Sequence, residues 1–179
     1  MIDIQTPKPG AQDAQLLSEI LAADSCRELF QDLGSSLQES SPPGTDEAGL
    51  SFCAIVGFSG ASIRGSLVLG VSPHAIQSVG GGNGNTPRDL MGELSNQLLG
   101  RLKNKLLPYG VELFLTIPVV LRGEHFAPMP RSELNPLRFG LNGGNVWLWI
   151  EVECFDGFEM RLEPSASVVP MAEGDALLF

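Results

Sequence analysis

Residues 86 to 107 carry the strongest structural signal in the chain, a repeat of apolar side chains at three- and four-residue steps. The repeat consists of Leu90, Met91, Leu94, Leu98, Leu102 and Leu106. In a helix with about 3.6 residues per turn, these side chains cover one side. Thr86 is a good N-cap, Pro87 fits the first helical position, and the charge of Asp89 suits the positive end of the helix dipole. The sequence therefore predicts a long helix with one buried side.

The opposite side of this helix is polar. Asp89, Glu93, Asn96, Gly100 and Asn104 fall on this one side at helical spacing, so Glu93 and Asn96 are predicted to point together into solvent. Gly100 costs about 1 kcal/mol relative to alanine in a helix interior, and it leaves a flat spot beside Asn96 that a partner surface could approach closely. A solvated face that bears Glu, Asn and Lys is also the ordinary outcome for a surface helix. Spacing alone leaves both interpretations open.

The residues of this helix also carry a family resemblance. The segment from Asp89 to Asn96, followed by Gly100 and later by Ile117-Pro118 in a predicted strand, resembles the signature of the CheC/CheX/FliY chemotaxis phosphatases. That signature is Asp or Ser, three residues, Glu, two residues, Asn, and a distant Pro. Residues 111–123 also look like the strand and turn that follow the helix in CheX-like domains. In its order of elements the resemblance covers residues 48 to 163.

The resemblance implies a reaction and a role for each matched residue. Proteins of this family hydrolyse the acyl phosphate on the aspartate of a CheY-type response regulator receiver domain by inserting the helix into its active site. Asn96 would then be the catalytic residue, because an amide accepts a hydrogen bond from water without adding anionic charge. Glu93 would be the docking or activating residue, pairing with the regulator's lysine near the phosphate. Asp89 is predicted to cap its helix, with substrate contact as the alternative.

The same resemblance bears on cofactors and assembly. The divalent metal, Mg²⁺, is expected on the receiver, so no cofactor-binding or metal-binding residue is predicted in this chain. Glu-x-x-Asn occurs only at Glu93 and Asn96, which makes the chain similar to the single-site CheX type and implies a homodimer formed through the sheets. The alternative function is a non-catalytic binding module that docks on a receiver domain or a signalling complex through this helix.

Composition argues against several other classes of function. With 179 residues, 43% of them hydrophobic, the chain can bury one substantial core. A net charge of −10 argues against nucleic acid or an anionic membrane as the main partner. Cys26, Cys53 and Cys154 show no metal spacing and are predicted to be buried free thiols in a reducing compartment. No apolar run or signal pattern predicts membrane insertion or export, so a cytoplasmic location is expected.

The remaining pattern predicts an α+β fold, CheX-like, with a mostly antiparallel sheet of five to six strands and two long helices. The expected domains are a flexible lead-in at 1–11, a single CheX-like domain at 12–163, and a C-terminal tail at 164–179. One long helix, or two broken near Asp24, is expected within residues 12–37. Strands are expected at 50–58, 63–71, 111–121, 137–141 and 146–155, with a possible last one at 158–162. A short helix starts at Ser72-Pro73, and Asn142-Gly143-Gly144 and Asp156-Gly157 suit hairpin turns.

Four further features of the sequence have a structural or a functional interpretation. Trp147 and Trp149 alternate with apolar residues along one predicted strand, and they either pack under a helix or form a dimer interface. The Gly-rich segment 80–85 is interpreted as a connector, since it lacks the Gly-Lys-Ser/Thr of a phosphate-binding loop. His74 and His125 are interpreted as surface residues. Arg122, at a strand end, either pairs with a carboxylate or borders the docking face.

Overall fold

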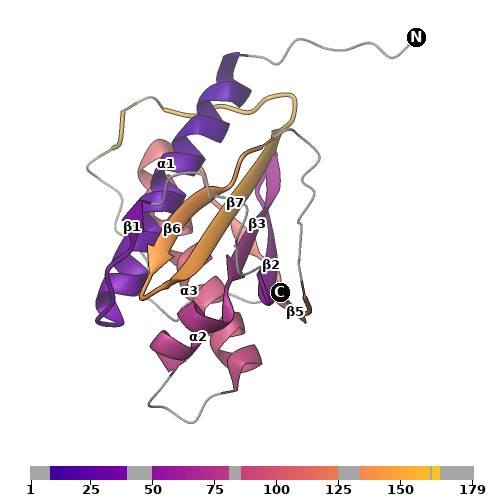
Figure 1. Cartoon of the computed structure of the whole chain (residues 1–179). Helices are drawn as coiled ribbons and strands as arrows, with labels where there is room; N and C mark the ends of the chain where they lie inside the picture. Colours follow the sequence, from indigo (N-terminus) through magenta and orange to yellow (C-terminus); the bar gives the residue numbers. More distant parts are fainter. Residues whose placement is uncertain (1–8, 40–49, 81–85, 125–133, 162, 166–179) are drawn as a thin grey trace.

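The structure, a computed structural model, describes residues 9–39, 50–80, 86–124, 134–161 and 163–165. It confirms the α+β class (Figure 1). In chain order the elements are α1 (Pro9–Asp32), β1 (Gln38–Glu39), β2 (Phe52–Ser59), β3 (Ile63–Val71), α2 (Pro73–Gly80), α3 (Pro87–Leu106), the 3-10 turn η1 (Leu107–Tyr109), β4 (Phe114–Leu115), β5 (Val119–Arg122), β6 (Leu137–Leu141) and β7 (Gly144–Cys154).

The strands form one sheet of seven, in the order β1, β6, β7, β3, β2 and then β4 and β5, which both pair with β2. Every pairing among the described strands is antiparallel. The expected five to six strands are too few for two reasons. β1 has two residues, too few to show alternation, and the strand expected at 111–121 is divided into β4 and β5. No strand forms over the described residues 158–161 of the possible last strand.

A β-bulge divides β4 from β5. Leu115 pairs with Phe58 and Val119 with Ile55, so three residues, 116–118, oppose two residues of β2. Pro118 lies in this bulge and has no N–H to give to the ladder. Because one extra residue reverses the alternation of side chains, Val120 packs against the core while Val119 is 57% exposed. Ile117-Pro118 therefore lie between two strands rather than within one.

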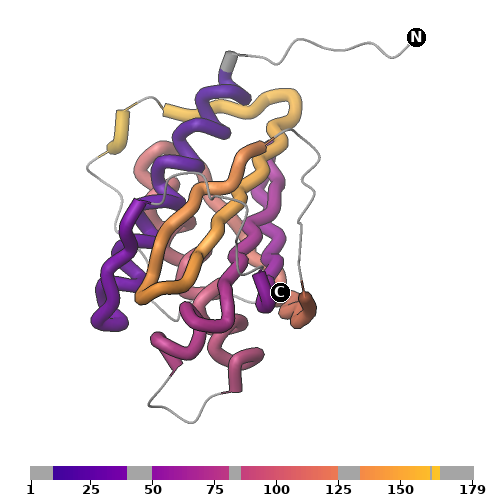
Figure 2. Tube along the Cα trace, in the orientation of Figure 1, coloured from indigo at the N-terminus to yellow at the C-terminus, as the bar shows by residue number. Residues whose placement is uncertain are grey.

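Helices α1 and α3 pack against each other and against one face of this sheet (Figures 1 and 2). The core lies between the two layers, where Val56, Leu67 and Leu148 are fully buried on the helix-facing side of their strands. Helix α2 contacts β7 and the neighbouring α3. This two-layer arrangement leaves one side of α3 in contact with the sheet and the other facing outward.

Helix α1 is one continuous helix that passes through Asp24 without a break. It starts at Pro9 and ends at Asp32, whereas residues 12–37 were expected. Near its start, Gln15 continues the hydrogen bonding of β7 beyond the end of β6. Its Nε2 donates to the carbonyl of Ile150 at 2.8 Å, and its Oε1 accepts from the N–H of Val152 at 2.9 Å. One amide side chain thus takes the place of a neighbouring strand.

The two tryptophans do not pack under a helix. Leu148 and Ile150 are the β7 residues that belong to the core between the layers, so Trp147 and Trp149 point to the opposite face of the sheet. Their rings meet edge to face at 5.8 Å, and the Arg138 guanidinium lies 4.7 Å from the Trp147 ring centroid. The interpretation of these rings as helix-packing residues is therefore wrong.

Several smaller expectations can be compared directly. The turn between β6 and β7 has positive φ angles at Asn142 (47°) and Gly143 (79°), as predicted. All three cysteines are free; Cys26 and Cys53 are buried, while Cys154 is half-buried. Burial raises the pKa of the Cys26 thiol to about 12 and that of Cys53 to about 11. Residues 81–85 of the Gly-rich segment lie outside the described residues, after α2 ends at Gly80.

Candidate functional site

The predicted start of α3 is confirmed at the level of atoms. The Thr86 hydroxyl accepts a hydrogen bond from the N–H of Asp89 at 3.2 Å and donates one to the Asp89 carboxylate at 2.6 Å. Pro87 occupies the first turn, where its missing N–H costs nothing. Asp89 is therefore a capping residue, and the first turn of the helix is fixed before the site residues begin.

The buried side of α3 sets its rotation about its own axis. The buried side chains of the helix are Met91, Leu94, Ser95, Leu98, Leu99, Leu102, Lys103 and Leu106. The hydroxyl of Ser95 donates to the carbonyl of Gly92 at 3.0 Å, so this polar group is satisfied inside the helix. Rotating the helix would expose this row, so the opposite side is held outward.

Glu93 and Asn96 are both exposed, one helical turn apart on that outward side. The Gln97 side chain donates from Nε2 to Glu93 Oε1 at 3.1 Å and so restricts the carboxylate. Among the described residues, the Asn96 amide has no hydrogen-bond partner, which leaves its donor and its acceptor available to an incoming group. Gln97 was not singled out from the sequence, although its i+4 spacing from Glu93 is the signal that could have found it.

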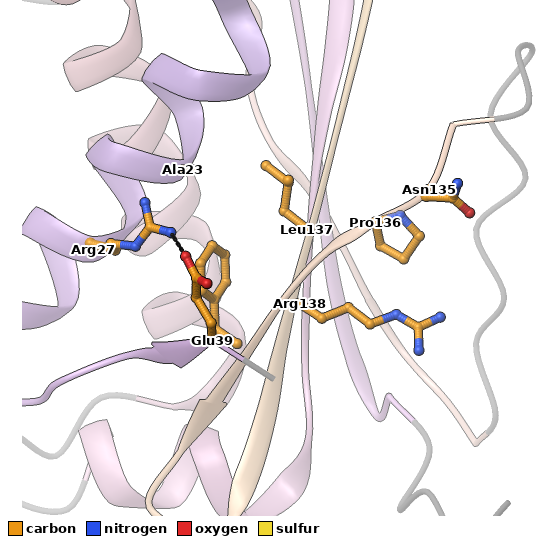
Figure 3. A pocket seen from close by; sticks show the side chains of 8 residues that line it. Ala23, Arg27, Glu39, Asn135, Pro136, Leu137 and Arg138 are labelled. Atoms are coloured by element: carbon orange, nitrogen blue, oxygen red, sulfur yellow. Dashed lines mark hydrogen bonds and ion pairs between the residues drawn. The ribbon is translucent and has the colours of Figure 1, made fainter. Parts of the chain in front are cut away.

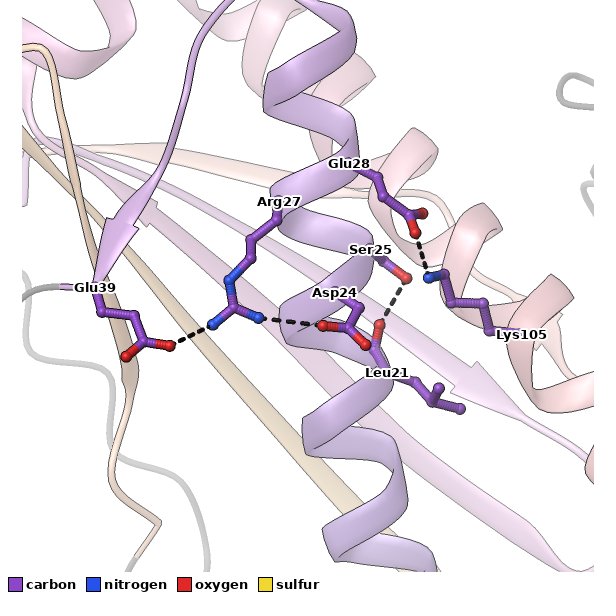
Figure 4. Close-up of polar contacts among 7 residues, drawn as sticks. All are labelled: Leu21, Asp24, Ser25, Arg27, Glu28, Glu39 and Lys105. Carbon is purple, nitrogen blue, oxygen red and sulfur yellow. Dashed lines mark hydrogen bonds and ion pairs between the residues drawn. The ribbon is translucent and has the colours of Figure 1, made fainter. Parts of the chain in front are cut away.

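Two ion pairs attach the second half of α3 to α1. Arg101 lies 2.8 Å from the Asp32 carboxylate, and Lys105 lies 2.7 Å from Glu28. Figure 4 shows the Lys105–Glu28 pair, together with Arg27 of α1 between Asp24 and Glu39. The charged ends of Arg101 and Lys105 are thus directed toward the neighbour helix.

The distant proline of the motif lies beside this helix rather than on it. Pro118 belongs to the bulge that turns Val120 toward α3, and a Cβ placed on Gly92 would lie 3.9 Å from Val120. Arg122, at the end of β5, has its guanidinium 5.7 Å from the ring centroid of Phe52 and is exposed. The fold therefore brings Asp89, Glu93 and Asn96 together on α3 and places Pro118 in the bulge between β4 and β5.

A separate hollow of about 390 Å³ lies between α1 and β6 (Figure 3). Its lining includes Arg27, which pairs with Glu39 at 2.8 Å, and Leu137 and Arg138 of β6. None of its lining residues belongs to α3. The sequence did not predict this hollow, because it joins residues of distant segments.

The described residues also bear on two other classes of site. In that part of the chain, no group of three or more His, Cys, Asp or Glu side chains is placed to hold a metal ion. No helix in the same residues is both long and apolar enough to cross a membrane. His74 is exposed on α2, as predicted, while His125 lies outside the described residues.

The chain was compared with known proteins. No protein-family model and no curated protein matches the sequence. A CheC-like superfamily protein from Shewanella sp. PV-4 matches in structure with a TM-score of 0.67 and 21% identity, over 76% of this chain and 97% of that chain. The chemotaxis protein CheX from Vibrio vulnificus matches with a TM-score of 0.62 and 22% identity, over 74% and 96%. This chain has the CheX-like fold.

A third match extends the comparison to a complex. A chain of the CheX–CheY–BeF3–Mg²⁺ complex from Borrelia burgdorferi matches with a TM-score of 0.58 and 17% identity, over 75% of this chain and 97% of that chain. The CheX-like fold predicted from the residues around α3 is thereby confirmed. Within this CheX-like fold, α3 presents Glu93 and Asn96 on the side away from the sheet.

Proposed function

We propose that this CheX-like chain is a phosphatase that hydrolyses the aspartyl phosphate of a CheY-type receiver domain in chemotaxis or a related two-component pathway. The observation that carries the proposal is the joint exposure of Glu93 and Asn96 on one anchored helix. A rigid helix that presents an acid and an amide one turn apart can enter a shallow pocket on another protein without first becoming ordered. The matched complex of CheX with CheY supports the class of partner.

The reaction requires little covalent chemistry from this chain. The water oxygen bonds to phosphorus while the bond between phosphorus and the aspartyl oxygen breaks. The electron pair of that bond stays on the receiver's carboxylate, and both water protons pass to the departing inorganic phosphate, H₂PO₄⁻. We assign Asn96 to the water, whose hydrogen bond its Oδ1 accepts while its Nδ2 donates to a second group. Fixing the water in line with the breaking bond is the contribution of the amide.

Glu93 has a different role in this proposal. Its carboxylate pairs with the lysine near the phosphate on the receiver, and the hydrogen bond from Gln97 holds it for that contact. The divalent metal, Mg²⁺, belongs to the receiver, where it offsets phosphoryl charge. The same proposal places the chain in the cytoplasm, a compartment in which its free thiols stay reduced.

The test is the decay of a phosphorylated CheY-type receiver in the presence of each variant. Asn96→Ala should slow the added hydrolysis at least about a hundredfold, because water is no longer positioned. Asn96→Asp should do the same although it keeps the shape, since its charge repels the phosphoryl group. Glu93→Ala should mainly weaken docking. Gln12→Ala removes an equally exposed amide from α1 and should change nothing.

Thermal melting shows whether the variants stay folded, and exposed substitutions of this kind usually change stability by less than about 0.5 kcal/mol. Wild-type protein that leaves the decay of every receiver of its genome unchanged contradicts the phosphatase proposal. Binding without faster decay would instead identify a non-catalytic docking module.

We also propose that the protein forms a homodimer through its sheets. The support is the apolar surface at β5, where Ile117, Val119 and Leu121 are 72%, 57% and 40% exposed. Among the described strands, β5 pairs with β2 alone, so one of its edges is open. Exposed apolar side chains along an open edge are a typical surface for association.

A further inference from the structure

Gly100 occupies the centre of the polar side of α3. At about 100° per residue, it lies about 20° from Glu93 and about 40° from Asn96 around the helix axis. Helical side chains lean toward the helix N-terminus, so a side chain at position 100 would cover the turn that carries Asn96. The absence of that side chain leaves the space over the Asn96 amide open.

Nothing within the described part of the molecule requires glycine at this position. A Cβ placed on Gly100 would have no atom within 4 Å, and its φ is not positive. Gly60 shows the contrast, because a Cβ there would lie 2.5 Å from the carbonyl oxygen of Glu112. Glycine also lowers the stability of a helix interior relative to alanine. Position 100 is therefore free of internal constraint and locally unfavourable for the fold.

Three neighbouring long side chains are directed away from this space. Gln97 bends back to Glu93, while Arg101 and Lys105 reach across to Asp32 and Glu28 of α1. The surface over Asn96 and Gly100 is therefore not covered by these three side chains. A partner can approach the helix backbone there.

We propose that Gly100 is a specificity-determining residue that keeps this space free for the receiver backbone next to the aspartyl phosphate. The inference rests on the proposed function. Asparagine and aspartate both have short side chains, so their backbones must come close before the Asn96 amide can reach a water beside the phosphorus. A side chain at position 100 would stand between the two backbones. Position 100 then limits which receiver loops fit.

The test measures affinity and stability together in Gly100→Ala and Gly100→Leu. The probe is a CheY-type receiver of the same genome loaded with Mg²⁺ and beryllofluoride. Crowding should raise Kd about threefold for Ala and at least about thirtyfold for Leu. Gly100→Ala should at the same time raise Tm by about 2 to 4 °C, because alanine favours the helix. A merely structural glycine would give no such opposite changes.

Gly92→Ala is the matched control on the same helix. Its added Cβ would face Val120 at 3.9 Å, an ordinary contact, so Kd should stay within about twofold of wild type. An equal loss of affinity in Gly92→Ala and Gly100→Ala, or an unchanged Kd in Gly100→Leu, overturns the inference. Wild-type protein that binds the beryllofluoride-loaded receiver but never speeds dephosphorylation of the phosphorylated receiver overturns only the phosphatase proposal. Wild-type protein that binds no receiver overturns both.

Discussion

The polar side chains of α3 form two groups, those bonded to other residues of the chain and those left exposed. Asp89 bonds to Thr86, and Arg101 pairs with Asp32, so these groups hold the helix in place. Glu93 is restricted by Gln97 but stays exposed, and Asn96 keeps both its donor and its acceptor available within the described structure. The residues that fix the helix thus lie before and after the two residues that face outward.

Cys26 makes a prediction for alkaline pH. Its thiol is fully buried, and desolvation raises its pKa from 9.0 to about 12, with the Arg27 charge acting weakly in the other direction. A raised pKa stabilises the fold below pH 9 and loses that contribution as the pH rises toward 12. The unfolding free energy should therefore fall by about 1.4 kcal/mol per pH unit above 9 from this group.

Urea unfolding of wild type and Cys26→Ala between pH 7.5 and 11 measures this slope. The variant is less stable at neutral pH because it leaves a cavity. The two stabilities should differ by a constant amount below pH 8.5 and converge above pH 9. Parallel curves throughout that range would contradict a raised pKa of Cys26 in the folded protein.

At the scale of elements, features of the fold that depend on the sequence of one segment were predictable, and features that depend on pairing with another segment were not. Thr86, Pro87 and the leucine repeat define α3 completely, including the exposure of Glu93 and Asn96. The start of α1 was placed too late, because Pro9 was interpreted as part of a loop although proline suits a first helical turn. The bulge at 116–118 depends on its register with β2, which alternation within one strand cannot reveal.

The bulge makes a prediction about two adjacent valines. Val120 packs against the core under α3, whereas Val119 is exposed on the other face. Val120→Asp would bury an unpaired charge and should lower the unfolding free energy by about 2 kcal/mol or more, while Val119→Asp should change it by less than about 0.5 kcal/mol. Urea unfolding checks both. The reverse order of effects would show that the strand runs without the bulge, since Val119 would then face the helices.

At the scale of the whole molecule, the sheet separates two surfaces. The helices cover one face, and α3 carries Glu93 and Asn96 outward from that side. Trp147, Trp149 and the exposed Leu121 belong to the other face. Alternation along β7 predicted that the tryptophans share a face. It could not predict which face the helices cover, because that choice depends on the path of the chain between distant elements.

Because the two surfaces lie on opposite faces of the sheet, the proposed dimer formation and the proposed phosphatase activity should be independent of each other. Leu121 is 40% exposed on the face of β5 opposite α3, so Leu121→Lys places a charge in the proposed dimer surface without touching the site. Light scattering should find wild type at twice the 19.1 kDa chain mass and the variant at the chain mass itself. Dephosphorylation per chain should stay within about twofold, since each chain carries a complete α3.

Glu93→Ala is the matched control for this experiment, because it changes the site and should leave the dimer mass unaltered. Wild-type protein that runs as a monomer at high concentration would remove the dimer proposal. A dimeric Leu121→Lys would move the interface away from β5. A folded, monomeric Leu121→Lys that no longer speeds dephosphorylation would show that the two faces are coupled, because only a contribution from the second chain could then complete the site.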